Sequence, residues 1–182
     1  MLLTIAVVLV AAVAALLAFA ATRPDTFQVQ RSATIAAPAE RIFPYLDDFH
    51  RWQAWSPWEK LDPELKRTFS GAEHGAGAVY AWVGNKKVGQ GQMEILQSDA
   101  PRRLRVKLDF IKPFEAHNIT VFTLAPTGDA TRLNWEMQGN HNFVSKLMCV
   151  FMDIDRMVGR DFERGLVNLK AVAESEPAPQ PA

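Results

Sequence analysis

The sequence has little of what two large classes of protein require. It has one cysteine, Cys149, in 182 residues, so no intramolecular disulfide can form and a disulfide-stapled secreted scaffold is excluded. Its 20 Lys and Arg residues balance its 20 Asp and Glu residues, so it lacks the basic excess typical of nucleic-acid binders. It also has no Cys or His pairs at zinc-ligand spacing. We therefore expect no metal, no cofactor and no nucleic-acid partner.

One long stretch has no charged side chain. Residues 1–22 read MLLTIAVVLVAAVAALLAFAAT, and about 20 apolar helical residues cross the roughly 30 Å hydrocarbon core of a bilayer. The sequence therefore predicts a single transmembrane anchor, followed by a short linker over residues 23–26. The alternative is a cleaved signal peptide, because Ala18-Phe19-Ala20 fits the cleavage pattern. The absence of Lys or Arg before the run favours the anchor.

The flanking charges predict how such an anchor is oriented. Arg23 and Arg31 follow the apolar run, and no basic side chain precedes it. Basic residues next to a membrane helix favour the cytoplasmic side. We therefore expect a single-pass membrane protein with its C-terminal domain facing the cytoplasm.

The following residues show the two-residue alternation of half-buried strands. Residues 27–36 alternate in this way, except that Arg31 falls on the apolar face without any reason visible in the sequence. Residues 104–110 form the clearest amphipathic strand. A helix beginning near Pro38 and a tryptophan-rich corner, HRWQAWSPW at 50–58, interrupt the strands. Strands joined by short turns predict an antiparallel meander.

A helical pattern replaces the strands after Gly139. Apolar residues recur every three or four positions from Phe143 to Leu169, which predicts one amphipathic helix of about 30 residues. Residues 175–182 are predicted to form a disordered Pro-rich tail. The apolar stripe of the helix and the apolar face of the sheet cover each other best if the helix lies in the concave face of a curved sheet. Such curvature can leave space between them.

Five segments make this α+β fold more specific. They are residues 35–43, 46–48, 52–58, 135–139 and 159–169. These segments resemble the START/polyketide-cyclase (SRPBCC) superfamily, and more narrowly its polyketide cyclase/dehydrase and lipid transport branch. The resemblance implies a helix-grip domain over residues 27–174, with a curved antiparallel sheet of about seven strands wrapped on a long C-terminal helix. The superfamily includes lipid carriers, quinone-binding proteins, cyclases and chaperone co-activators, so the resemblance implies a fold more than an activity.

Candidate site residues come from the inward faces of these elements. None of the four histidines falls in a catalytic frame, so the sequence predicts no catalytic residue and no metal ligand. Large apolar residues on inward faces suit both a packed core and the wall of a cavity. Asp155 borders the apolar stripe, where it could contact the polar head of a ligand or pair with Arg31. The predicted ligand-binding residues are Trp82, Met93, Phe110, Trp135, Met137, Phe151, Asp155 and Phe162.

Three functions remain open at this point. The first is membrane-tethered binding or transport of a hydrophobic small molecule, such as a lipid, an isoprenoid quinone or a polyketide-like compound. An anchor favours it, because it would hold a cavity beside the bilayer in which such molecules dissolve. The second is a protein-interaction or co-chaperone-like module. The third is a cyclase or dehydratase, for which the sequence contains no visible acid–base pair.

Overall fold

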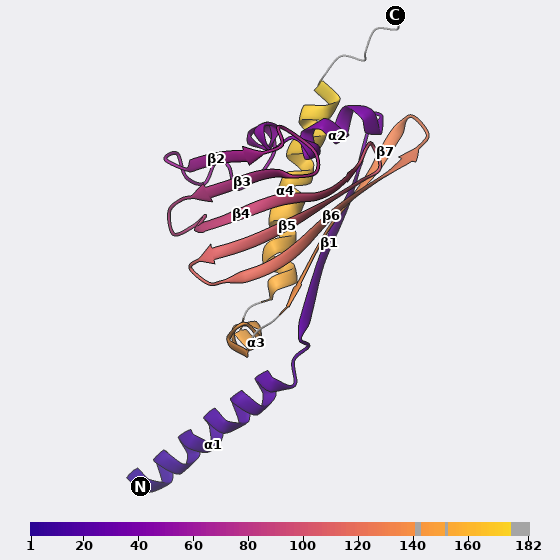
Figure 1. Ribbon diagram of the computed structural model, residues 1–182. Coiled ribbons are helices and arrows are strands. Elements are labelled where there is room, and N and C mark those ends of the chain that lie inside the picture. Colours follow the sequence, from indigo (N-terminus) through magenta and orange to yellow (C-terminus); the bar gives the residue numbers. More distant parts are fainter. Residues whose placement is uncertain (141–142, 152, 176–182) are drawn as a thin grey trace, which may run out of the picture.

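The computed structural model describes residues 1–140, 143–151 and 153–175, so the predicted tail beyond Ser175 lies outside the described residues. Figure 1 shows an isolated helix leading into a curved sheet with a long helix across it. In chain order the elements are α1 (Leu2–Ala21), β1 (Thr26–Ile35), α2 (Ala39–Asp47), the 3-10 helix η1 (Phe49–Ala54), β2 (Lys66–Gly71), β3 (Ala78–Val83), β4 (Gln90–Asp99), β5 (Arg103–Lys112), β6 (Ala116–Thr127), β7 (Ala130–Asn140), α3 (Phe143–Phe151) and α4 (Ile154–Ser175).

All seven strands form one antiparallel sheet in the order β1-β7-β6-β5-β4-β3-β2. The first strand therefore pairs with the last, from Thr26 opposite Asn140 to Ile35 opposite Thr131. α4 crosses one side of the curved sheet, while α2 lies at the end of β1 that is remote from α1 (Figure 1). This is the predicted helix-grip architecture, with a curved sheet wrapped on a C-terminal helix.

The prediction of one continuous C-terminal helix was wrong. The chain forms two helices, α3 and α4, which point in different directions (Figure 1). Asp153 lies between them and caps the second helix: its Oδ1 accepts a hydrogen bond from the N–H of Arg156 at 3.0 Å, and its carbonyl oxygen accepts one from the N–H of Met157. An aspartate that accepts hydrogen bonds from the first N–H groups of a helix favours the beginning of a helix at that position. The apolar spacing continues across this break and concealed it.

The tryptophan-rich corner closes the end of the sheet remote from α1. Trp52 donates its indole N–H to the carbonyl oxygen of Leu46 at 3.0 Å, and Trp55 donates to that of Tyr45 at 2.8 Å. Both rings are buried and pack edge-on against Phe122 of β6. The corner thus ties α2 and η1 to the inner face of the sheet.

α1 is exposed along nearly all of its length. By length and composition it is the one helix among the described residues that is apolar enough to cross a membrane, a test that a signal sequence would also pass. Near its C-terminal end Ala20 is fully buried, and α1 contacts α3 there. The ammonium group of Lys146 in α3 pairs with the carboxylate of Asp25. These contacts hold α3 against the junction between α1 and the sheet.

Candidate ligand-binding cavity

A cavity of about 340 Å³ lies between α4 and the inner face of the sheet. Its volume is at the lower end of the about 300–1,000 Å³ that small-molecule sites occupy. Most of its wall is apolar. β3 to β5 contribute Trp82, Met93, Val106, Leu108 and Phe110, β7 contributes Trp135 and Met137, α4 contributes Met157, Val158 and Phe162, and the corner contributes Trp52 and Trp58.

The structure brings six of the eight predicted ligand-binding residues to this cavity. They are Trp82, Met93, Phe110, Trp135, Met137 and Phe162. Phe151 falls in α3, and its side chain lies outside the described residues. Asp155 is exposed at the start of α4 and is not among the residues that line the cavity. It takes part in a separate polar cluster.

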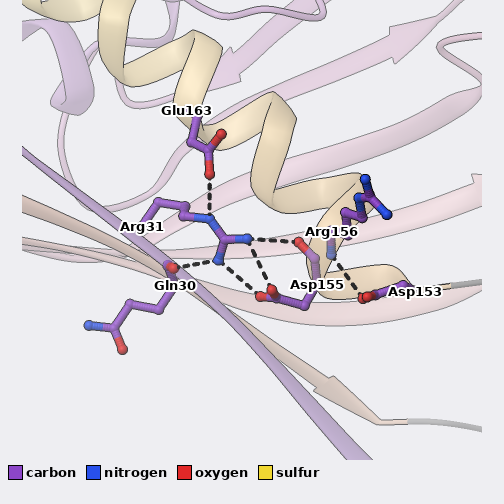
Figure 2. Close-up of polar contacts among 6 residues, drawn as sticks. All are labelled: Gln30, Arg31, Asp153, Asp155, Arg156 and Glu163. Carbon is purple, nitrogen blue, oxygen red and sulfur yellow. Dashed lines mark hydrogen bonds and ion pairs between the residues drawn. The ribbon is translucent and has the colours of Figure 1, made fainter.

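That cluster explains the arginine on the apolar face of the first strand. The Arg31 guanidinium donates two hydrogen bonds to the Asp155 carboxylate, at 2.9 and 3.0 Å, and one to Glu163 Oε1 at 2.9 Å (Figure 2). It also donates to the carbonyl oxygens of Asp155 and Gln30. An added Cβ at Gly159 would lie 1.9 Å from Arg31 Nη2, so glycine is what lets α4 pass this close. The cluster fastens the first turns of α4 to β1.

The cluster also shifts the acid–base equilibrium of its members. The hydrogen bonds from Arg31 lower the pKa of Asp155 below its ordinary value. The same bonds, together with the one to Glu163, raise the pKa of Arg31 further above its already high value. Both groups are therefore charged at neutral pH. Arg31 binds both oxygens of the Asp155 carboxylate. Of the two roles that the sequence left open for Asp155, contact with a ligand or pairing with Arg31, the structure therefore shows the pairing.

A second polar cluster, which the sequence analysis missed, lies in the wall of the cavity. Glu59, only 9% exposed, accepts a hydrogen bond from the Tyr80 hydroxyl at 2.7 Å and another from Arg67 Nε at 2.7 Å. Burial and the bond to Glu59 raise the pKa of Tyr80 well above its ordinary range, so the phenol stays protonated. One signal was available: Arg67 shares a face of its strand with Phe69, and a charge on an inward face needs a partner.

The hydrogen-bonding groups of this second cluster are used to stabilise the cavity wall and are not free to react. Both carboxylate oxygens of Glu59 accept bonds from within the protein, and Arg67 also donates to the backbone carbonyls of Leu65 and Glu59. Glu59 and Tyr80 also line the cavity, where they add polar surface to a mostly apolar wall. No three His, Cys, Asp or Glu side chains converge as a metal site in the part of the chain that the structure describes.

The deep part of the cavity lies among aromatic rings. Trp135 stacks on Phe162, with ring centroids 4.0 Å apart and planes 9° from parallel. Trp55 and Trp58 pack edge-on against the same indole. An added Cβ at Gly165 would lie 2.8 Å from Cζ3 of Trp135, so this glycine lets α4 approach the ring. Trp135 is 2% exposed, and its indole N–H has no hydrogen-bond partner among the described residues.

The mouth of the cavity is at the end of the sheet that α1 joins. Antiparallel pairing puts the start of β1, the β5–β6 turn and the β3–β4 turn at this one end (Figure 1). Two exposed residues that line the cavity, Lys87 and Met157, mark its opening. The neighbouring rim exposes apolar and basic side chains. They are Val83, Lys86, Ile111, Lys112 and Phe114.

Two larger hollows lie on the surface. One, of about 680 Å³, runs between α4 and residues 56–60, and the other, of about 560 Å³, lies beside the starts of β1 and β6, the end of β7 and the middle of β5. Charged and polar side chains predominate in both linings, including Lys60, Arg160 and Glu163 in the first and Lys107 and His117 in the second. Small-molecule sites are usually enclosed and mainly apolar, so the smaller cavity is the better candidate.

A seven-stranded antiparallel sheet that grips a C-terminal helix over an apolar cavity defines the helix-grip class. Within that class, the model of one family, polyketide cyclase / dehydrase and lipid transport, matches residues 26–174, and the chain belongs to this family. A comparison with curated proteins gives no match.

Solved structures share the fold at low sequence identity. Protein CV1439 from Chromobacterium violaceum is 17% identical, with a TM-score of 0.59 over 85% of this chain and 100% of that one. The Aha1 dimer from Colwellia psychrerythraea is 14% identical, with a TM-score of 0.59 over 84% and 99%. The di-domain ARO/CYC protein BexL is 14% identical, with a TM-score of 0.62 over 87% of this chain and 53% of that one. At these identities the likeness concerns the fold alone.

Proposed function

We propose that the protein binds a hydrophobic small molecule in the cavity while α1 holds the domain at a membrane. The observation that carries this proposal is an apolar cavity with its mouth at the end of the sheet joined to an apolar helix of 20 residues. A ligand dissolved in the bilayer could then enter without crossing much water. The exposed Ile111 and Phe114 on the rim suit contact with lipid.

The family supports ligand binding at a general level, because its description includes lipid transport. We propose a lipid, an isoprenoid quinone or a polyketide-like compound as the ligand, and a domain that faces the cytoplasm, as Arg23 and Arg31 favour. Lys86, Lys87 and Lys112 on the rim would also meet an anionic leaflet favourably.

The test uses the full chain and begins with membranes washed in carbonate. The chain should stay with the membrane pellet. Recovery of a mature chain that begins at Ala21 in a soluble fraction would instead identify a cleaved signal peptide. The retained protein is then moved into lipid nanodiscs, and the bound small molecules are extracted and compared by mass spectrometry with the nanodisc bilayer itself.

A matched pair of α4 variants makes the second step specific. Val158 lines the cavity, whereas Val167 is exposed on the same helix. We expect one class of molecule to be enriched, relative to the bilayer, in extracts of the wild type and of Val167→Phe. In extracts of Val158→Phe the amount of this molecule should be several-fold lower. A wild type that enriches nothing contradicts ligand binding and favours the protein-interaction alternative. Extraction of a chemically altered ligand would favour a cyclase or dehydratase.

A further inference from the structure

Trp135, which lines the deep part of the cavity, carries a hydrogen-bond donor that no described residue uses. The indole Nε1 of Trp135 is buried and has no partner among the described residues. Buried polar groups nearly always have a partner, so an unpaired donor needs an explanation. Because Trp135 lines the cavity, a bound molecule is a ready source of the missing acceptor.

The rings that pack around this indole are weaker acceptors for its N–H than an oxygen atom would be. Phe162 stacks on one face, and the rings of Trp55, Trp58 and Phe122 surround it at centroid distances of 5.1 to 5.9 Å. Ring faces accept N–H groups only weakly. A carbonyl or ether oxygen in the cavity would accept the same N–H as a full hydrogen bond.

A second polar group lies on the neighbouring strand. Thr120 of β6 is 5% exposed and lines the cavity. It pairs in register with Met137, and the next inward-facing position of β6, Phe122, pairs with Trp135. Thr120 and Trp135 are therefore diagonal neighbours on one face of the sheet, within reach of a single small group.

The charges around the cavity decide what kind of acceptor fits. The two carboxylates that border it, Glu59 and Asp161, are paired with Arg67 and Arg164, so neither pair offers a free positive charge to an anion. The half-buried Arg67 is already committed to Glu59, and the basic residue in the lining, Lys87, is exposed at the mouth. A carboxylate at the deep end would lose its water without gaining a counter-charge. A neutral oxygen avoids this cost.

We propose, on the basis of the function proposed above, that the ligand presents a neutral carbonyl or ether oxygen to Trp135 and Thr120, with its apolar part toward the mouth. Quinones, ketones and esters belong to this class, and free fatty acids do not. The tail of such a ligand would extend toward the end of the sheet that joins α1.

The test compares two ligands of nearly the same shape that differ in the acceptor. One is a 2-methyl-3-alkyl-1,4-naphthoquinone, and the other is the corresponding alkylnaphthalene. The full chain in nanodiscs carries ¹⁵N-labelled tryptophan, and the resonance that Trp135→Phe removes identifies the N–H of Trp135. We expect the quinone to shift this resonance and the hydrocarbon to leave it in place.

Affinity provides the second measurement. Thr120→Val removes the hydroxyl with little change of shape, and the exposed Thr123→Val on the same strand is its control. A neutral hydrogen bond is worth about 2- to 12-fold in affinity. We expect Thr120→Val and Trp135→Phe each to weaken quinone binding by about this factor relative to hydrocarbon binding, and Thr123→Val to change neither.

The outcomes separate this inference from the proposed function. If the two ligands bind equally and the Trp135 resonance does not move, the ligand oxygen is not the acceptor of the Trp135 N–H. An ordered water or a ring face is then the partner of this N–H. The proposal that the cavity binds a hydrophobic ligand would still stand. A long-chain fatty acid anion that binds more tightly than the quinone overturns the neutral class. If no hydrophobic molecule binds at all, both proposals fail. Should Trp135→Phe not fold, Thr120→Val alone decides.

Discussion

The interior of the domain is filled at one end and hollow at the other. Toward α2, Leu104, Phe122, Leu133 and Leu169 are completely buried. Toward α1, Leu108, four residues further along the same face of β5 as Leu104, borders the cavity and is only half-buried. One strand thus serves both regions. Because the apolar pattern of the strand is the same in both regions, the hollow arises from where α4 lies against the sheet.

The stacked pair of Trp135 and Phe162 lies where the two regions meet. Both rings line the cavity, and both are almost completely buried. Trp135 also packs edge-on against Trp55, which belongs to the filled end. Beyond this pair, Leu166, Leu169 and Ala173 continue the buried stripe of α4 into the filled end. The same helix therefore packs tightly in its second half and borders the cavity in its first.

Removing the same side chain from each end should give the clearest contrast. Leu104→Ala leaves a void in a filled region, and we expect a loss of about 2–5 kcal/mol in the free energy of unfolding. Leu108→Ala enlarges a space that exists already, and we expect roughly half that loss or less. Denaturant unfolding of the full chain, followed by tryptophan fluorescence, measures both. Equal losses would show that the interior is equally filled at both ends.

Enlarging a side chain should also affect the two ends differently, with a smaller change in stability than removing one. Ala173 of α4 is completely buried in the filled end, and Val158 of the same helix lines the cavity. Overpacking a filled interior costs about 1–3 kcal/mol, so Ala173→Phe should lower the melting temperature of the ligand-free protein. Val158→Phe should leave it unchanged or raise it, because the ring enters existing space. A marked destabilisation by Val158→Phe would indicate that the cavity closes in solution.

The smallest effect concerns the ion pair where α4 begins. Arg31 holds the pKa of Asp155 below its ordinary value, so the pair stabilises the fold at neutral pH, and this contribution is lost as pH falls below about 4. Because the Asp155 side chain is 58% exposed, we expect only about 0.2–1 kcal/mol. The difference in unfolding free energy between wild type and Asp155→Asn, measured from pH 7 to pH 3, should shrink on the acid side. A difference that stays constant with pH would assign the effect to packing.

The strands could be predicted because their pattern is local. Residues 27–36 alternate with period two, and the structure forms β1 over Thr26–Ile35. The break between α3 and α4 could not be read from the same kind of pattern, because apolar spacing continues across Asp153. Its effect depends on the backbone N–H groups that it caps.

For the candidate site, sequence periodicity identified wall positions but not polar partners. Trp82 and Met93 could be selected because they occupy inward positions of their strands. Tyr80 shares the face of Trp82 and could have been included on the same ground. Glu59 lies in an irregular segment outside the strands, and Arg31 lies 124 residues from Asp155 in the chain. Contacts this distant in sequence depend on how the sheet and α4 come together.

If α1 spans a membrane, as proposed above, its short junction with the sheet limits where the protein can work. Four residues, 22–25, separate the end of α1 from the start of β1. Even fully extended, four residues span only about 14 Å, less than the roughly 30 Å thickness of a bilayer core, and the pairing of Asp25 with Lys146 shortens their reach further. With α1 embedded, the domain could not travel to a second membrane. Any cargo would have to arrive and leave by lateral diffusion in the same bilayer, or through a protein that comes to it.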